Sequence, residues 1–280
     1  MNMEKKRFFQ KYPVFCVFAV LAVLIVLAAI FAPQLTRGVN PVKGSLKEAI
    51  KAPSAEHPFG TDKMGRDIFT RVLYGARTSL SSTFILVGVI FVVGSLLGVL
   101  AGYFGGWVDA VIMRLADMMI AFPGLVLAIA VAGILGASTK NAIIAIAVVS
   151  WPKYARLARS LVMKIRHTDF VAAATVTGSR TLYMLWKYMF PNTITTLIIT
   201  AATDIGGMMM ELAALSFLGF GAQPPTPEWG SMLNEGRNFM QSAPWLMVYP
   251  GLPIFVIVVV FNMLGDGLRD ILDPHSNEGR

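Results

Sequence analysis

Long stretches without a charged side chain are the feature that most limits how this chain can fold. The longest covers 31 residues, 78–108, and another covers 22 residues, 118–139. At about 1.5 Å per helical residue, each is long enough to cross the roughly 30 Å hydrocarbon core of a bilayer. Only 14% of the residues are charged, against roughly 25% in soluble domains, so the chain is expected to reside in a membrane.

Six segments are predicted to cross the membrane. The first, 14–32, is an apolar run of 19 residues, and a permanent anchor is favoured over a cleaved signal peptide because no Ala-x-Ala site closes the run. Backbone groups in hydrocarbon must be satisfied within each segment, so the spans should be helices and the fold class all-α. The ten-residue alternation of a β-barrel is absent. The other predicted spans are 78–108, 118–139, 141–161, 190–217 and 242–265.

Basic side chains before the first span favour one orientation in the membrane. In short segments, lysine and arginine gather on the cytoplasmic side. With six spans, both termini of this multi-pass protein of the cell membrane are then predicted to be cytoplasmic. The four basic side chains are Lys5, Lys6, Arg7 and Lys11.

The division of the chain follows from this orientation. Residues 1–77 are expected to hold the first span, an extracytoplasmic loop and an interfacial amphipathic helix near 68–77. Residues 78–280 are expected to form the core membrane domain, with a cytoplasmic loop at 162–191. A short external helix is predicted near 229–240.

Composition excludes several classes of protein. The 24 lysines and arginines give a net charge of +8, but they lie in clusters between uncharged stretches and do not form one basic patch. Nucleic-acid binding is therefore not expected. The single cysteine, Cys16, lies in an apolar run, and His57, His167 and His275 have no metal-ligand spacing, so no metal site is assigned and no cofactor is expected. A phosphate-binding glycine loop and a Ser/His/Asp constellation are both absent. The chain is therefore predicted not to be an enzyme, and any energy must come from another chain.

The cytoplasmic loop is predicted to contain two short helices that project from the membrane. Asp169 suits the N-cap of the first, and Gly178 suits the left-handed residue after its last turn. The second should run from 181 to 190, where Pro191 suits the first turn of the fifth span. An ordinary loop with two helical turns is the alternative. The first helix carries small side chains that would let another protein approach closely: Ala172, Ala173 and Ala174.

Two acidic residues lie in the fifth predicted span. Asp204 and Glu211 are seven positions apart, with Met208 between them on the same side of a helix. A charged side chain at mid-membrane costs roughly 2.5–3.5 kcal/mol on insertion scales, so both should face protein or water. They are candidates for a translocation pathway that meets cationic cargo, or for a structural pair near a helix end.

Several motifs together resemble one transporter family. The small-residue helix with Gly178 and the Phe190-Pro191 ending is similar to the EAA loop in permease subunits of ABC importers. Further matches, in order along residues 57–275, resemble the C-type permeases of the dipeptide, oligopeptide and nickel importers. They are Phe59-Gly60-Thr61-Asp62, Gly65-Arg66-Asp67, Leu215-Ser216-Phe217-Leu218-Gly219, Gln223-Pro224-Pro225-Thr226-Pro227-Glu228-Trp229-Gly230, and Phe261-Asn262 through Gly265-Asp266 to Leu268-Arg269-Asp270.

The resemblance implies an architecture and a set of partners. It implies a type I, MetI-like importer permease in membrane lipid, paired with a second homologous permease, two cytoplasmic ATP-binding subunits and an extracytoplasmic solute-binding protein. The loop at 162–191 would couple the spans to the ATPases. Ala172 stands where the family has Glu. Counted from Asp169 it is the N3 position, so the helix would lose a bond back to its N-cap while coupling survives.

The cargo is the least constrained part of the resemblance. Asp204-Ile205-Gly206 with Met208-Met209, the EAA loop without its Glu and the position of Glu211 look more similar to nickel-type than to peptide-type permeases, so nickel or a nickel chelate is favoured over di- or oligopeptides. Methionine and carboxylate groups would accept a metal, and equally the amino terminus of a peptide. A secondary transporter or channel that relays protons or cations through the two acids is the main alternative. A non-transporting membrane scaffold is a third alternative, but it gives no role to the buried acids or to the cytoplasmic loop.

Overall fold

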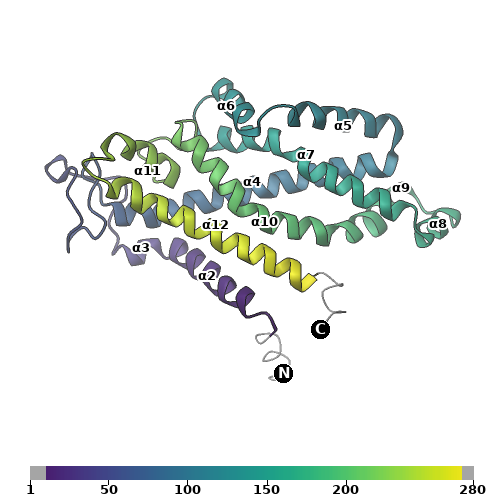
Figure 1. The fold of residues 1–280 in the computed structure, drawn as a ribbon, viewed down its shortest axis with the longest axis horizontal. Helices are drawn as coiled ribbons and strands as arrows, with labels where there is room; N and C mark the ends of the chain where they lie inside the picture. The colour runs from purple at the N-terminus through teal and green to yellow at the C-terminus, as the bar shows by residue number, and fades with distance from the viewer. Residues whose placement is uncertain (1–10, 273–280) are drawn as a thin grey trace.

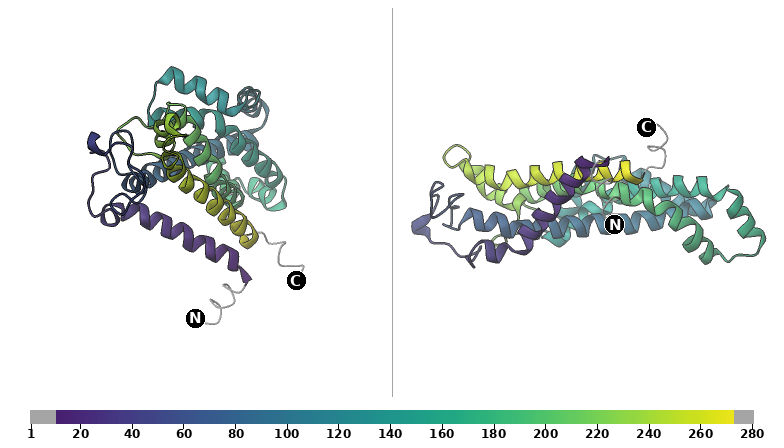
Figure 2. Two further views of the ribbon diagram at one scale, coloured as in Figure 1. Left: turned by 60° about the vertical axis from the view of Figure 1, so that its left-hand side comes forward. Right: turned by 90° about the horizontal axis from the view of Figure 1, so that it is seen from below.

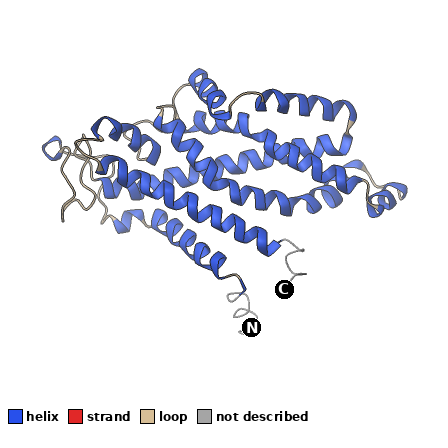
Figure 3. Ribbon diagram, viewed as in Figure 1, coloured by secondary structure: helices blue, strands red, loops and turns tan. Residues whose placement is uncertain are grey.

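The structure is a computed structural model that describes residues 11–272. Within this range the regular structure is helical, apart from one isolated bridge between Thr61 and Asp67, which confirms the all-α prediction (Figure 3). The longer helices are α2 (Pro13–Ile30), α4 (Ile68–Phe104), α5 (Gly106–Ile120), α6 (Gly124–Leu135), α7 (Thr139–Arg166), α10 (Phe190–Phe217) and α12 (Trp245–Leu272). The shorter elements are α3 (Ala32–Leu35), η1 (Leu46–Glu48), α8 (Asp169–Val176), α9 (Thr181–Met184), the π-helical turn η2 (Leu185–Met189), α11 (Trp229–Gly236) and η3 (Arg237–Phe239).

The helices form an elongated bundle with different ends. The loop between α3 and α4 lies with α11 at one end, and α8 lies at the opposite end (Figure 1). The beginning of α2 and the end of α12 both point away from the end that carries α11 (Figures 1 and 2). Lys5, Lys6, Arg7 and His275 lie outside the described residues.

Fewer segments than the predicted six qualify as candidate spans by length and apolar composition. Among residues 11–272, four helical segments are long and apolar enough to cross a membrane: α2, α4, α12 and the continuous stretch Thr181–Phe217. A fifth span exists only if α5 and α6 count together, and these two meet at 94°. The predicted span 118–139 is therefore broken, because Pro123 precedes α6 and the chain turns there. Hydropathy alone does not detect such a change of direction.

The predicted span 141–161 lies inside the longer helix α7. Pro152, expected to interrupt it, is buried within a helix that continues to Arg166. Two arginines of α7 pair with α5: Arg159 binds Asp109, and Arg156 lies 2.5 Å from Asp117. These pairs explain how α7 carries several positive charges while it packs beside other helices.

The interfacial helix expected near 68–77 is the beginning of α4. Asp67 is its N-cap and accepts a hydrogen bond from the Thr70 amide at 2.7 Å. No proline follows in α4, so the helix continues over 37 residues to Phe104. The expected division at residue 77 thus falls inside one helix.

Close contact between α4 and α7 depends on three glycines spaced four residues apart. A Cβ atom added at Gly98 would lie 2.2 Å from the Ala155 carbonyl oxygen, and one at Gly94 would lie 2.6 Å from that of Trp151. A Cβ atom added at Gly102 would likewise come too close to the Val162 side chain. Small residues at this spacing let helix backbones approach closely in membranes. On either side of this contact, one apolar cluster joins α4, α6, α7 and α10, and another joins α2, α4, α11 and α12.

Candidate coupling loop and translocation pathway

The helix α8 ends at Gly178 as its position in the sequence predicts. Gly178 has φ of +79°, the left-handed region that glycine adopts without strain. Its amide donates to the Thr175 carbonyl at 3.0 Å, and the Ser179 amide donates to the Ala174 carbonyl at 3.1 Å. These two bonds form a Schellman motif, which fixes the direction of the chain after α8.

The beginning of α8 differs from the prediction. Thr168, not Asp169, is the N-cap, and its hydroxyl donates to the Ile165 carbonyl instead of capping α8. The Thr168 amide also bonds to Ile165, so the last turn of α7 leads directly into the new helix. Counted from Thr168, Ala172 is the fourth helical position, so the capping-box interpretation of this residue is wrong. Asp169 occupies the first turn, where a carboxylate interacts favourably with the helix dipole.

The loop lies at one end of the bundle (Figure 1), and several of its exposed side chains are apolar. The side chains of Val171 and Ala174 are buried in the apolar cluster that joins α4, α6, α7 and α10, called the α4–α7–α10 cluster below. Ala172 and Ala173 are exposed. Only two of the three predicted alanines are therefore available to another protein. Large apolar side chains beside them are strongly exposed: Val176 88%, Leu182 66% and Trp186 59%.

The second predicted helix of the loop is continuous with the fifth span. It begins as α9, passes through the π-helical turn η2, and enters α10, where Pro191 lies in the first turn as predicted. Proline has no amide hydrogen to donate to the preceding turn, and local π-type hydrogen bonding is a common adjustment near such sites. The second half of the loop is therefore joined to α10 without a non-helical linker.

Asp204 of α10 is bound by two side chains of α7. Lys153 Nζ lies 2.5 Å from Asp204 Oδ1, and the Tyr154 hydroxyl donates to Asp204 Oδ2 at 3.0 Å. Tyr154 is only 2% exposed, whereas the Lys153 side chain is 58% exposed. The carboxylate is therefore already paired with a lysine.

The other two predicted pathway residues are less constrained. Glu211 is half-buried and makes no hydrogen bond or ion pair with residues 11–272. Met208, between the acids, packs at the edge of the α4–α7–α10 cluster. Seven helical residues separate Asp204 and Glu211 by about 10.5 Å along the axis. Of the two carboxylates, Glu211 is the one free to bind a cationic group.

A buried charge cluster at the opposite end was not predicted. Arg66 Nε lies 2.6 Å from Asp62, and its Nη2 lies 2.9 Å from Glu235 of α11. Arg71 of α4 also lies 2.9 Å from Glu235. Asp62, Arg66 and Arg71 lie close together in the sequence. Glu235, which binds both arginines, lies 169 residues beyond Arg66. The cluster fastens the loop before α4 to α11.

Glu228 makes a second connection at this end. Its carboxylate caps α11 by accepting from the amides of Gly230 and Ser231 at 2.9 and 2.8 Å, and it also accepts from Ser79 of α4. Burial raises the pKa of Glu228, although these hydrogen bonds oppose the shift. The next residue, Trp229, donates its indole hydrogen to the Val72 carbonyl at 2.9 Å. The beginning of α11 is thus held against α4.

These features define a multi-pass helical membrane protein with an exposed loop at one end and paired charges between its helices. The chain belongs to the family described as binding-protein-dependent transport system inner membrane components, whose model matches residues 94–277. Two relatives are identical to it at close to half of the aligned positions. It is 48% identical over 246 residues to the dipeptide transport system permease protein DppC of Alkalihalophilus pseudofirmus, covering 88% of this chain and 81% of that protein. It is 44% identical over 224 residues to the glutathione transport system permease protein GsiD of Pectobacterium atrosepticum, covering 80% and 74%.

Solved structures show the same fold. An inward-facing MetNI methionine ABC transporter matches with a TM-score of 0.59 at 17% identity, covering 74% of this chain and 98% of that chain. An amino acid ABC transporter with histidines matches with a TM-score of 0.54 at 18% identity, covering 74% and 95%. The predicted MetI-like permease architecture is confirmed.

Membership of the family establishes the general function. The chain is a permease subunit of an ABC importer in the inner membrane, and it is not catalytic because ATP hydrolysis belongs to partner subunits. The family implies ATPase and substrate-binding partners. The comparisons give no support to a transporter that relays protons or cations alone, or to nickel as cargo.

Proposed function

We propose that this chain forms one half of a pathway for short peptides, paired with a second homologous permease. The observation that carries the proposal is the 48% identity over 246 residues with a dipeptide permease. The glutathione permease of similar identity supports the same chemical class of cargo. The nickel preference expected from the methionine and carboxylate pattern has no such support, so peptides replace nickel as the first candidate.

In this proposal Glu211 is the side chain of the pathway that meets the peptide. A peptide at neutral pH carries an ammonium group, and an unpaired carboxylate can accept charge-assisted hydrogen bonds from it. Asp204 plays a different part, because Lys153 and Tyr154 already occupy both of its oxygens. It ties α7 to α10 beside the pathway. Met208, next to Glu211 on the helix, offers a soft surface that adapts to different peptide side chains.

The loop at 162–191 would bind an ATPase subunit in the cytoplasm. Exposed Val176, Leu182 and Trp186 supply the apolar contacts, and Ala172 with Ala173 allows close approach. Nucleotide-driven closure of the ATPases would move α8, and α10 would follow because the two are joined through η2. The spans then alternate between inward-open and outward-open states. Both termini lie on the cytoplasmic side in this arrangement.

Reconstitution tests the proposal. The four subunits and the binding protein are placed in vesicles, and uptake of a labelled dipeptide is compared with uptake of labelled nickel. We expect dipeptide uptake that requires ATP and that decreases at least tenfold in Glu211→Gln, which keeps the shape of the side chain but removes its charge. Uptake of nickel but not of dipeptide would overturn the cargo. Uptake driven by an ion gradient without ATP would overturn the coupling.

A further inference from the structure

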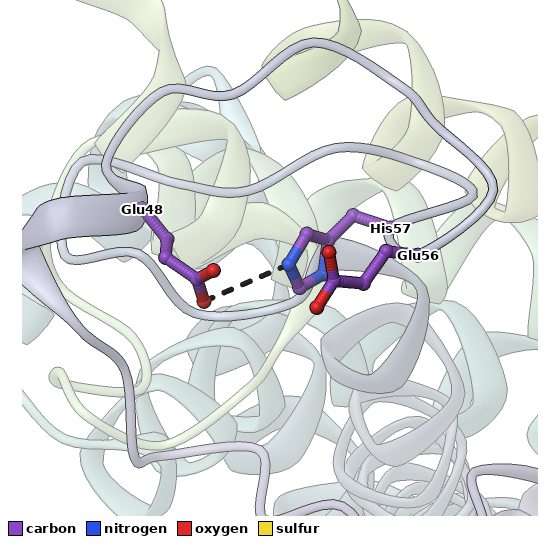
Figure 4. Close-up of side chains that lie close together, drawn as sticks. All are labelled: Glu48, Glu56 and His57. Atoms are coloured by element: carbon purple, nitrogen blue, oxygen red, sulfur yellow. Dashed lines mark ion pairs between the residues drawn. The ribbon is translucent and has the colours of Figure 1, made fainter.

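Three side chains of the loop before α4 converge on one point. Glu48, Glu56 and His57 each offer one ligand atom, and these atoms lie within 4.8 Å of one another. Figure 4 shows Glu48 extending from η1 toward the His57 ring, while Glu56 and His57 come from a neighbouring stretch of the loop. This loop lies at the end of the bundle opposite α8 (Figure 1). The transport pathway and the coupling loop make no use of the cluster.

Asp67 fixes the hydrogen on the histidine ring. His57 Nδ1 lies 3.0 Å from Asp67 Oδ2, and a carboxylate can only accept, so Nδ1 carries the hydrogen. The other oxygen of Asp67 accepts the Thr70 amide at 2.7 Å, which holds the carboxylate in place. In the neutral ring the lone pair is then on Nε2. Metal-binding histidines are oriented in the same way, with the second ring nitrogen bound to a carboxylate.

The ring nitrogen that carries the lone pair has no hydrogen-bond partner. His57 Nε2 is buried and unsatisfied, and it faces Glu48 Oε2 at 3.7 Å. A buried lone pair that faces a carboxylate oxygen with no hydrogen between them is unfavourable, and a cation between the two atoms removes the conflict. Two ligands of a tetrahedral ion bound at about 2.0–2.1 Å stand roughly 3.3 Å apart. The observed separation is thus within a small side-chain movement of the geometry of a metal site.

The carboxylates have ligand atoms available. Glu48 uses Oε1 to accept from Lys51 Nζ at 3.0 Å, which leaves Oε2 free for a ligand. Glu56 is exposed and makes no hydrogen bond or ion pair with other residues in the range 11–272, so it can turn toward the site. One imidazole and two carboxylates suit zinc, whereas calcium and magnesium prefer oxygen ligands alone.

We propose that Glu48, Glu56 and His57 form a binding site for Zn²⁺, completed by water. The ion would join η1 to the stretch at residues 56–57 and, through Asp67, to the first turn of α4. This end of the bundle also holds the Arg66–Glu235 pair, so the ion would stiffen a loop that is already anchored to α11.

Zn²⁺ titration of the complete importer, purified without a polyhistidine tag, tests the site against a chelating dye. The decisive variant is His57→Asn, since the asparagine amide still donates to Asp67 but offers no ligand in place of Nε2. We expect wild type to bind Zn²⁺ and His57→Asn and Glu56→Gln to bind it at least about tenfold more weakly. His167→Asn, at the C-cap of α7, is the matched control and should leave the affinity unchanged.

Thermal unfolding gives a second readout. Because an ion that binds only the folded state stabilises it, Zn²⁺ should raise the Tm of wild type and of His167→Asn, but not that of His57→Asn. Calcium at the same concentration should have no effect. Equal Zn²⁺ affinity in wild type and His57→Asn would overturn the proposal. The absence of micromolar binding in wild type would also overturn it, and would leave His57 as a protonated link between Asp67 and Glu48.

Discussion

Tyr154 of α7 donates its hydroxyl hydrogen to Asp204 of α10 over 3.0 Å, and the adjacent Lys153 binds the other oxygen of the same carboxylate. One side chain thus connects α7 to α10. Tyr154 makes its hydrogen bond inside the bundle, where it is 2% exposed, whereas the Lys153 side chain is 58% exposed on this chain.

Removing the carboxylate should weaken this connection more than removing the tyrosine hydroxyl. Tyr154→Phe loses one hydrogen bond, about 0.5–1.5 kcal/mol, whereas Asp204→Ala also leaves the buried hydroxyl unsatisfied, at about 1–3 kcal/mol. The measurement is thermal unfolding of the purified importer in detergent. Glu211→Ala, which removes a carboxylate without a bound partner, is the control and should change stability least. Equal destabilisation by Tyr154→Phe and Asp204→Ala would contradict this account.

Gly178→Val should uncouple ATP hydrolysis from transport. A β-branched residue is strained at φ of +79° by about 1–2 kcal/mol, although no atom within 4 Å would meet its Cβ. The last turn of α8 should therefore shift while the membrane helices insert normally. Gly178→Asn is the matched variant, since asparagine tolerates this conformation, and it should retain activity. Uptake and substrate-stimulated ATPase activity are measured, and full uptake in Gly178→Val would count against the assigned role.

Gly98→Leu should disrupt the packing of α4 on α7. The added Cβ would lie 2.2 Å from the Ala155 carbonyl oxygen, which belongs to backbone and cannot rotate away. Overpacking of this kind costs about 1–3 kcal/mol. Gly88→Leu on the same helix is the control, because nothing lies within 4 Å of its Cβ position. The account predicts a lower Tm for Gly98→Leu alone, and equal melting of the two variants would exclude the close contact.

Glu228 should make the stability of the importer depend on pH. Burial raises its pKa in the folded state above the ordinary value of 4.5, so between these two values the folded protein binds more protons than the unfolded chain. Stability from this group is fully present below 4.5 and is lost as pH rises through the raised pKa. Glu228→Gln removes the charge and keeps one acceptor oxygen for the amides of α11. Its Tm relative to wild type should therefore increase as pH rises, and a difference that does not change with pH would refute the effect.

Local signals in the sequence predicted the local structure well. Gly178 followed a short alanine-rich helix, and both the left-handed conformation and the end of α8 are as expected. The apolar runs predicted helices, including one that continues through Pro152, but not where the chain turns, so the break before Pro123 was missed. The direction of a helix depends on what it packs against, and hydropathy averages do not contain that information.

Contacts between segments that lie far apart in the chain could not be predicted from the sequence. The acids of α10 were correctly placed on one helix, but nothing local identified Lys153 as the partner of Asp204. Glu235 likewise meets Arg66 across 169 residues. The glycine spacing at 94, 98 and 102 was a usable signal for helix contact that the prediction of spans did not exploit.

The central claim is that α8 faces the cytoplasm, where a partner ATPase moves it. Thiol labelling of intact cells tests this most directly, with Cys16 replaced by serine. Val176→Cys and Leu46→Cys place single thiols at opposite ends of the bundle, on side chains that are 88% and 72% exposed. An impermeant reagent should label Leu46→Cys in intact cells, and Val176→Cys only after the membrane is opened. Labelling of Val176→Cys from outside intact cells would contradict the account.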